Sequence, residues 1–155
     1  MATTHFALIT DWHFTAPLER VWALIEDTQA WPTWWRAVKR VEQLRAGEAD
    51  GVGAMHRLTW ATALPYTLTF DVETIRVERL SEIEGRAFGE LDGTGLWTLH
   101  TEPEGTHVRY LWRVEVTKPW MRLFAPLLRP VFAWNHNKVM CWGLEGARKR
   151  LAETD

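Results

Sequence analysis

Residues 82–116, EIEGRAFGELDGTGLWTLHTEPEGTHVRYLWRVEV, decide the fold of this chain. Polar and apolar residues alternate along three runs, 82–91, 95–101 and 106–117, and this alternation is typical of half-buried β-strands. Asp92-Gly93 and Glu104-Gly105 separate the runs. Asp-Gly favours a tight antiparallel hairpin, because both residues can adopt a positive φ. The segment therefore predicts consecutive hairpins, that is, a β-meander.

The same signals continue toward the N-terminus. Strand-like runs cover residues 38–45, 52–64 and 66–80, and Asp50-Gly51 marks a turn between the first two. Residues 5–14 alternate more loosely and predict a first strand. The sequence therefore predicts seven antiparallel strands.

Two short helices are predicted between the first and second strands. Thr15 is suited to cap the first one, Pro17 to occupy its first position, and Val21, Trp22 and Ile25 lie on one apolar face. Residues 27–28 end that helix and are suited to cap the second, which carries the sequence AWPTWW at 30–35.

The C-terminal region predicts a long helix. Apolar and small residues recur at steps of three and four and predict its buried face: Leu123, Leu127, Val131, Asn135, Val139, Trp142 and Gly146. Pro126 and Pro130 predict a kink or a division in its first part, and we expect a short helix followed by a long one spanning about 130–152. One amphipathic helix cannot cover a curved seven-stranded sheet tightly, so we expect a space between them.

Composition limits the class of protein. A chain of 155 residues and 18.1 kDa predicts a single domain over residues 1–155. A net charge of -2 and a pI near 6.3 argue against a nucleic-acid-binding protein. One cysteine, Cys141, excludes an internal disulfide, and we expect it to be a small buried apolar residue. The sequence shows neither the pattern of a signal peptide nor a membrane-spanning stretch, which predicts a soluble, cytoplasmic protein.

Eleven residues are tryptophan. They occur in the predicted short helix, in strand-like runs at Trp60, Trp97 and Trp112, and along the C-terminal helix. Aromatic surface distributed over both a sheet and its covering helix suits the lining of an apolar pocket. For each tryptophan taken singly, a place in an ordinary core is the alternative.

Several motifs together resemble one known superfamily. Ala16-Pro17, Val21-Trp22 and residues 31–34 look like the opening of the SRPBCC superfamily, the START-like group that includes polyketide cyclases/dehydrases and lipid-transport proteins. Residues 93–98 and 134–136 resemble its later strands and its C-terminal helix. The resemblance implies an α+β helix-grip fold, with the antiparallel sheet curved around the long C-terminal helix and a cavity between them. It does not select one function, because the superfamily includes carriers, receptors and enzymes.

Strand parity predicts which side chains face the inside. It places His56, Trp60 and Tyr110 inward and His100 outward. Together with the helix stripe, it predicts these ligand-binding residues: His56, Leu58, Trp60, Phe70, Trp97, Tyr110, Trp112, Val131, Asn135, Val139 and Trp142.

Three polar residues fall on these otherwise apolar faces. His56, Tyr110 and Asn135 either satisfy one another and the backbone, or they orient a ligand; His136 flanks the same space. They are also the candidate catalytic residues of an enzyme, with His56 as the base and Tyr110 or Asn135 as the donor.

Motifs of other chemistries are missing from the sequence. The histidines do not follow a metal-binding pattern, no glycine-rich phosphate loop connects a strand to a helix, and Ser81 is the only serine. We therefore expect neither a metal nor another cofactor.

The leading hypothesis is a protein that binds a hydrophobic small molecule, a lipid or a polyketide-like compound, in an internal cavity. The alternatives are a polyketide cyclase/dehydrase-type enzyme and a protein-interaction module. We expect no nucleic-acid partner and no stable membrane insertion. Residues 120–128, which hold more apolar side chains than one buried face needs, allow a transient membrane contact or a mobile entrance, whereas a packed helix start is the alternative. The oligomeric state stays open.

Overall fold

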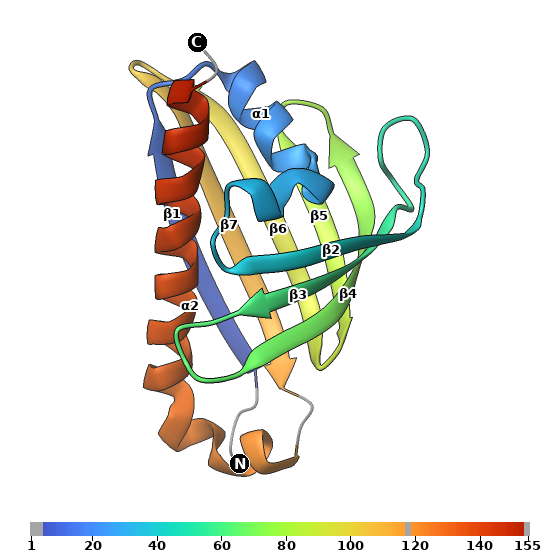
Figure 1. The fold of residues 1–155 in the computed structure, drawn as a ribbon, viewed down its shortest axis with the longest axis vertical. Helices are drawn as coiled ribbons and strands as arrows, with labels where there is room; N and C mark the ends of the chain where they lie inside the picture. Colours follow the sequence, from blue (N-terminus) through green and yellow to red (C-terminus); the bar gives the residue numbers. More distant parts are fainter. Residues whose placement is uncertain (1–4, 117–118, 154–155) are drawn as a thin grey trace.

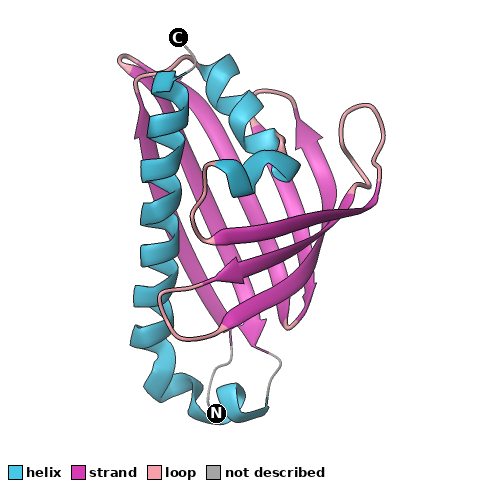
Figure 2. Ribbon diagram, in the orientation of Figure 1, coloured by secondary structure: helices cyan, strands magenta, loops and turns pink. Residues whose placement is uncertain are grey.

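The computed structural model describes residues 5–116 and 119–153. The elements in chain order are β1 (His5–Phe14), α1 (Leu18–Glu26), η1 (Thr28–Thr33), β2 (Val38–Arg45), β3 (Met55–Ala61), β4 (Thr67–Glu78), β5 (Glu82–Gly89), β6 (Leu91–Glu102), β7 (Gly105–Val116) and α2 (Pro119–Glu153). The predicted helix-grip fold, with seven antiparallel strands, two short helices and a long C-terminal helix, is confirmed (Figure 2). Thr117, the predicted last residue of the final strand, lies outside the described residues.

The seven strands form one sheet with the order β1-β7-β6-β5-β4-β3-β2. The strands from β2 to β7 pair in sequence order, each with the next, and β1 pairs with β7 at the edge opposite β2. Figure 1 shows β2 and β3 crossing in front of β7, β6 and β5, with α2 running along the side near β1. The sheet therefore folds back over its own concave face and leaves an interior for α2 to close.

The hairpin predicted at Asp92-Gly93 is wrong. Both residues lie inside β6, where Gly93 pairs with Val114 of β7. The reversal comes earlier, at Gly89, whose φ is +120°. A Cβ at Gly93 would lie 2.0 Å from the Arg113 carbonyl oxygen, so this glycine allows close approach of two strands instead of a turn. The turn predicted at Asp50-Gly51 lies between β2 and β3, as expected.

The predicted division of the C-terminal helix at its prolines is also wrong. Residues of α2 are helical from Pro119 to Glu153, with Pro126 and Pro130 inside the helix. Both prolines are exposed, so water can satisfy the carbonyl groups that lose a hydrogen bond. In Figure 1 the first turns of α2 lie at an angle to the long remainder.

The face that α2 buries differs from the predicted one at its N-terminal end. Met121 and Ala125 are buried, whereas Leu123 and Leu127 of the predicted stripe are exposed. Farther along the helix, Asn135 and Val139 are buried as predicted. The sequence is apolar on both of these faces, so periodicity alone does not show which one meets the sheet.

Tryptophans of η1 and the residues after it pack on the C-terminal half of α2. Trp35 donates a hydrogen bond from Nε1 to the Val139 carbonyl oxygen at 2.9 Å. A Cβ at Gly143 would lie 2.6 Å from the Trp35 ring, and one at Gly146 would lie 1.7 Å from the Trp34 carbonyl oxygen. These two glycines let the helix approach the tryptophan cluster closely. Seven of the eleven tryptophans are buried, and three of these, Trp12, Trp22 and Trp34, pack in the core without lining the cavity described below.

Two smaller predictions are corrected by the structure. Helix α1 begins at Leu18, with Pro17 at the cap position instead of Thr15. Cys141 is exposed instead of buried, because it lies on the outer side of α2. Across residues 5–116 and 119–153, no helix combines the length and the apolar character needed to cross a bilayer.

Candidate ligand-binding site

A cavity of about 410 Å³ lies between the concave face of the sheet and the helices. All strands from β1 to β7, together with α1, η1 and α2, contribute to its lining. Most of the lining side chains are aliphatic or aromatic, and they face inward with the period of two that strands impose. A space of this size falls within the range of small-molecule sites in proteins.

Aromatic rings form a continuous wall along this cavity. The ring of Phe70 on β4 stacks on Trp60 of β3 at 6.3 Å and lies 5.8 Å from Trp112 of β7. Tyr110 then lies 6.0 Å from Trp112 and 4.2 Å from Trp97. Rings of β4 and β7 meet although two strands separate them, because the sheet is sharply curved. Flat aromatic surface of this kind favours flat, apolar ligands.

Tyr110 points its hydroxyl group across the neighbouring strand. A Cβ at Gly95 of β6 would lie only 2.3 Å from this oxygen, so the missing side chain makes room for the phenol. Burial raises the pKa of Tyr110 well above its usual range, which keeps the hydroxyl protonated. This hydroxyl makes no hydrogen bond to another described residue. It is thus a free donor in an apolar space.

Two further polar atoms of the lining lack partners. Trp60 Nε1 and His136 Nδ1 are both buried and make no hydrogen bond within the described residues. Burial lowers the pKa of His136 to about 4, against a smaller opposing effect of Asn137, so its imidazole is neutral at physiological pH. A buried polar group without a partner costs about 1–3 kcal/mol. A ligand that hydrogen-bonds to these atoms removes that cost.

Asn135, in contrast, is already bound to the protein. Its Oδ1 accepts a hydrogen bond from the Ala63 backbone N–H at 2.9 Å, and its Nδ2 donates to the Tyr66 hydroxyl at 3.4 Å. Asn135 thereby ties α2 to the connection between β3 and β4. About five residues of strand, or about 16 Å, separate His56 from Ala61 at the end of β3, and Asn135 is bonded beyond that end, at Ala63. The pairing of His56 with Asn135 or with Tyr110 at one reacting centre stays a prediction.

His56 lies toward the opposite end of the cavity, next to the β2–β3 connection. Its side chain is half-buried, and burial lowers its pKa. His56 is therefore neutral at physiological pH and can accept or donate one hydrogen bond.

The opening of the cavity is polar and acidic. Exposed lining residues come from the end of α1, the start of η1 and the β2–β3 connection, and they include Glu26, Asp27 and Asp50. Gln29 donates a hydrogen bond to Gln43 at 2.6 Å, which links η1 to β2 at this opening. Within the described part of the chain, neither arginine nor lysine lines the cavity.

The sequence matches a family model over residues 9–153, nearly its whole length, and that family is described as polyketide cyclase/dehydrase and lipid transport. The chain belongs to this family. The superfamily resemblance seen in the sequence is therefore confirmed. No curated protein sequence matches the chain.

Solved structures share the fold of this polyketide cyclase/dehydrase and lipid transport family member. A protein from Thermus thermophilus is 21% identical, with 97% of this chain and 100% of that one covered, at a TM-score of 0.77. A START superfamily protein from Mycobacterium smegmatis is 14% identical, with 97% and 99% covered, at a TM-score of 0.75. The Zhui aromatase/cyclase from Streptomyces sp. R1128 is 16% identical, with 96% and 93% covered, at a TM-score of 0.72. At these identities the likeness concerns the fold.

Most of the predicted ligand-binding residues of this family member do line the cavity. They are His56, Leu58, Trp60, Phe70, Trp97, Tyr110, Trp112, Asn135 and Val139. Two do not. The side chain of Val131 is exposed, and Trp142 lies under the Arg36 guanidinium, 4.3 Å from its ring centre, on the far side of the tryptophan cluster.

The sequence-based prediction omits several lining residues. Trp31 and Trp35 line the cavity from η1 and the residues that follow it, and Met121 and Phe132 line it from the first half of α2. The dense tryptophan sequence at 30–35 is a usable signal for the first pair. The second pair, Met121 and Phe132, has no such signal, because the apolar periodicity of α2 indicates the face that carries Leu123 and Leu127.

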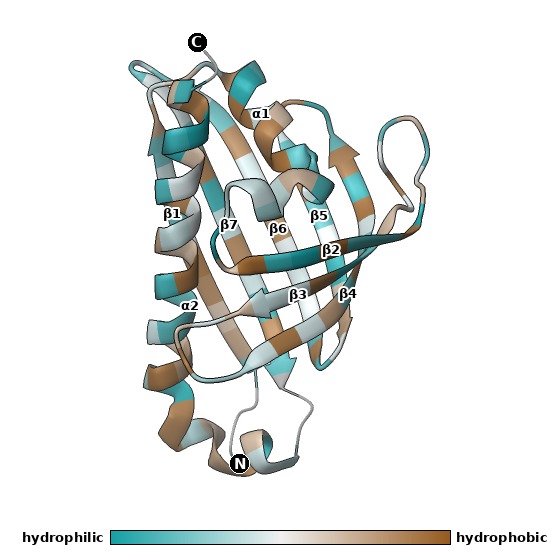
Figure 3. Ribbon diagram, viewed as in Figure 1, coloured by the Kyte–Doolittle hydropathy of each residue, from teal (hydrophilic) through white to brown (hydrophobic). Residues whose placement is uncertain are grey.

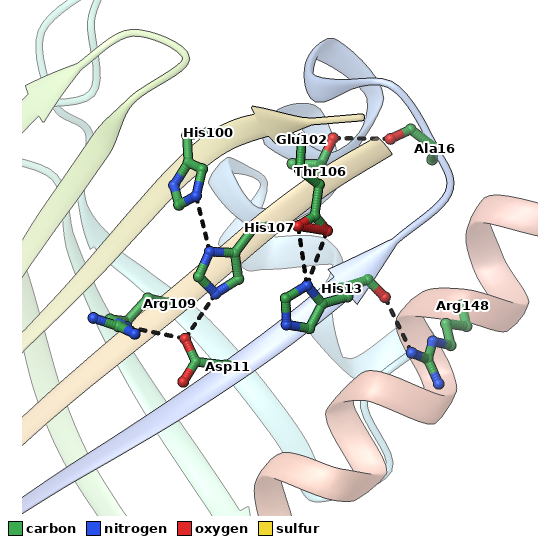
Figure 4. Close-up of polar contacts among 9 residues, drawn as sticks. All are labelled: Asp11, His13, Ala16, His100, Glu102, Thr106, His107, Arg109 and Arg148. Atoms are coloured by element: carbon green, nitrogen blue, oxygen red, sulfur yellow. Dashed lines mark hydrogen bonds and ion pairs between the residues drawn. The ribbon is translucent and has the colours of Figure 1, made fainter. Parts of the chain in front are cut away.

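A second polar group lies on the outer face of the sheet, and none of its residues lines the cavity. Figure 4 shows its hydrogen bonds and ion pairs. His13, His107 and His100 occupy directly paired positions on β1, β7 and β6. His107 bonds to His100 at 2.9 Å and to Asp11 at 2.7 Å, and hydrogen bonds from Arg109 and His107 lower the pKa of Asp11. The described residues include no three His, Cys, Asp or Glu side chains arranged to hold a metal ion.

Proposed function

We propose that this protein binds an uncharged, flat, hydrophobic small molecule that carries hydrogen-bonding oxygen atoms. The observation that carries the proposal is the aromatic-walled cavity of about 410 Å³, in which Trp60 Nε1 and His136 Nδ1 are buried without a partner among the described residues and the Tyr110 hydroxyl lies beside them in the lining. Apolar walls provide affinity, and a few unpaired polar groups fix the orientation of a ligand. Family membership, which includes lipid-transport proteins, supports the same function.

The charge of the lining supports an uncharged ligand. An isolated carboxylate placed in an apolar interior loses its hydration and needs a cation in return. This cavity offers none from arginine or lysine of the described chain, and burial keeps His136 neutral. Carboxylates at the opening, such as Asp27 and Asp50, further disfavour an anion. A ketone, phenol or alcohol meets the same donors without these costs.

A matched pair of probes tests this proposal. We expect 9-anthracenemethanol to bind and quench tryptophan fluorescence at pH 7, and 9-anthracenecarboxylate to bind at least about tenfold more weakly, the equivalent of about 1.4 kcal/mol. Equal or tighter binding of the carboxylate contradicts an uncharged ligand.

Two variants of β4 locate the binding in the cavity. Leu68 lines the cavity, whereas Ile75 on the same strand is exposed on the other face. Leu68→Trp should fill part of the space and abolish calorimetric binding of the alcohol, and Ile75→Trp should leave it unchanged. If both variants bind equally well, the probe occupies another place and the proposed site is wrong.

Catalysis on a poly-carbonyl compound is the second candidate, because the cavity holds neutral histidines beside an unpaired phenol. An enolisation needs a base next to the carbonyl and a donor for the enolate oxygen. His56 or His136 is suited to the first role and Tyr110 to the second. The similarity in fold to an aromatase/cyclase agrees with this candidate. The test is mass spectrometry of a synthetic poly-carbonyl compound after incubation with the wild-type protein or with Tyr110→Phe. A catalyst forms a product in an amount that depends on Tyr110, whereas a carrier forms no product.

A further inference from the structure

The N-terminal half of α2 carries a continuous apolar face that nothing in the described chain covers. Leu123 and Leu127 are 72% and 76% exposed, and Trp120 and Trp134 are about half exposed at the two ends of the same stripe. With Phe124 and Val131 these residues recur at steps of three or four, so they share one side of the helix. We call these six residues the α2 stripe. In Figure 3 the first part of α2 is predominantly brown, the hydrophobic end of the scale.

Exposed apolar surface of this extent marks a contact site, and the chemistry around it identifies the partner. From residue 119 to residue 144 the helix carries Arg122, Arg129 and Lys138 and no acidic side chain, although the whole chain has a net charge of -2. Tryptophans at the two ends of a stripe are suited to the boundary between headgroups and acyl chains. Arginine and lysine beside an apolar face are suited to anionic headgroups.

We propose that the α2 stripe docks this protein on the surface of an anionic lipid bilayer. The helix lies in the interface with the stripe toward the acyl chains and with Arg122 and Lys138 toward the headgroups, whereas the Arg129 guanidinium packs over the Phe6 ring, 5.0 Å from its centre. A helix face whose apolar side chains stand exposed suits a deformable lipid surface. The acidic cavity opening lies away from this end of α2, near η1 and the β2–β3 connection, so it does not oppose the docking (Figure 1).

The opposite side of the same helix segment faces the cavity. Met121 is buried and lines the cavity. Phe132 also lines the cavity, and its ring lies 5.5 Å from the ring of Phe6. Docking thus brings the cavity to within about one helix diameter, about 10 Å, of the lipid. That position suits exchange of a hydrophobic ligand with the bilayer. The exchange rests on the proposed function, whereas the docking is independent of it.

Vesicle flotation of the ligand-free protein tests the docking. We expect the wild-type protein to float with phosphatidylcholine vesicles that contain phosphatidylglycerol, and Leu123→Gln/Leu127→Gln to lose at least about tenfold in vesicle affinity, since two leucine side chains lose their contact with lipid. The matched control is Ile9→Gln/Ile75→Gln, two exposed isoleucines of the sheet, which should bind as the wild type does. Wild-type flotation by the leucine variant overturns the proposal.

A second pair of variants tests the charge. Arg122→Gln/Lys138→Gln should weaken binding to the anionic vesicles several-fold and leave the small affinity for pure phosphatidylcholine unchanged. Binding that does not respond to this change or to added salt contradicts the proposed orientation. Light scattering tests the remaining outcome, in which the α2 stripe is a protein interface. In that case the wild type is a dimer that does not bind vesicles, and Leu123→Gln/Leu127→Gln is a monomer. This result would show that the membrane proposal is wrong. Binding of 9-anthracenemethanol by each variant shows separately whether the cavity still functions.

Discussion

Replacement of His136 by leucine should remove a defined part of the acid sensitivity of this protein. Burial lowers the pKa of His136 from 6.5 to about 4, and its Nδ1 has no partner in the described chain. The unfolded chain therefore takes up a proton on this imidazole more readily than the folded one. The free energy of unfolding then falls as the pH drops below 6.5, and this loss ends below about pH 4.

The two pKa values set the magnitude of the effect. By the linkage relation, protonation of this single group lowers the free energy of unfolding by about 2 kcal/mol between pH 7 and pH 5. Carboxylates that titrate in the same range contribute equally to the wild type and to the variant. The difference between the two proteins thus isolates the imidazole.

Urea unfolding monitored by tryptophan fluorescence measures the effect. The wild type should lose about 2 kcal/mol more than His136→Leu between pH 7 and pH 5. His5→Leu is the control for the loss of a histidine, because His5 is exposed and lies outside the cavity lining. Parallel losses in the wild type and His136→Leu would show that the imidazole is hydrated or paired in solution, and would remove it from the free polar atoms of the cavity.

Three other substitutions test the packing around the cavity. Asn135→Leu should lower the free energy of unfolding by about 1–3 kcal/mol with or without ligand, because the Ala63 N–H loses its acceptor. Asn137→Leu, on the exposed side of the same helix, should have little effect. Equal losses for the two variants in urea unfolding would refute the role of Asn135 in holding α2 to the β3–β4 connection. Gly146→Ala should prevent stable folding, since its Cβ meets a backbone oxygen at 1.7 Å; a folded variant by circular dichroism with unchanged melting contradicts this packing. Gly95→Ala should displace the Tyr110 phenol and weaken 9-anthracenemethanol binding while the protein stays folded; unchanged affinity by fluorescence quenching places the probe away from Tyr110.

Strand parity is a reliable guide to the cavity walls. A strand alternates its side chains with a fixed period of two, so one correct inward residue fixes the rest. His56, Leu58 and Trp60 of β3 therefore all line the cavity, in agreement with the parity of the sequence. Turn chemistry is less reliable, because Gly93 serves a close contact with β7 and produces the same local sequence signal as a hairpin.

The long helix is harder to predict because both of its N-terminal faces are apolar. Leu123 and Leu127 predict the buried face, whereas Met121 and Ala125 occupy it. Periodicity measures how apolar residues recur along a helix, and it contains no information about which of two apolar stripes meets the sheet. When a chain has a second apolar face, the ambiguity is itself informative, since it predicts a surface for another partner.

The polar residues of the helix illustrate the same limit at the scale of one residue. Asn135 and His136 are neighbours in sequence, and one step along a helix turns a side chain by about 100°. This turn directs the Asn135 amide to the β3–β4 connection, where it is satisfied, and leaves His136 Nδ1 buried at the cavity without a partner in the described chain. Their roles therefore diverge: Asn135 holds the helix in place, and His136, kept neutral by burial, contributes polarity without charge. We therefore propose that this cavity disfavours ions and favours uncharged molecules whose oxygen atoms reach its unpaired polar groups.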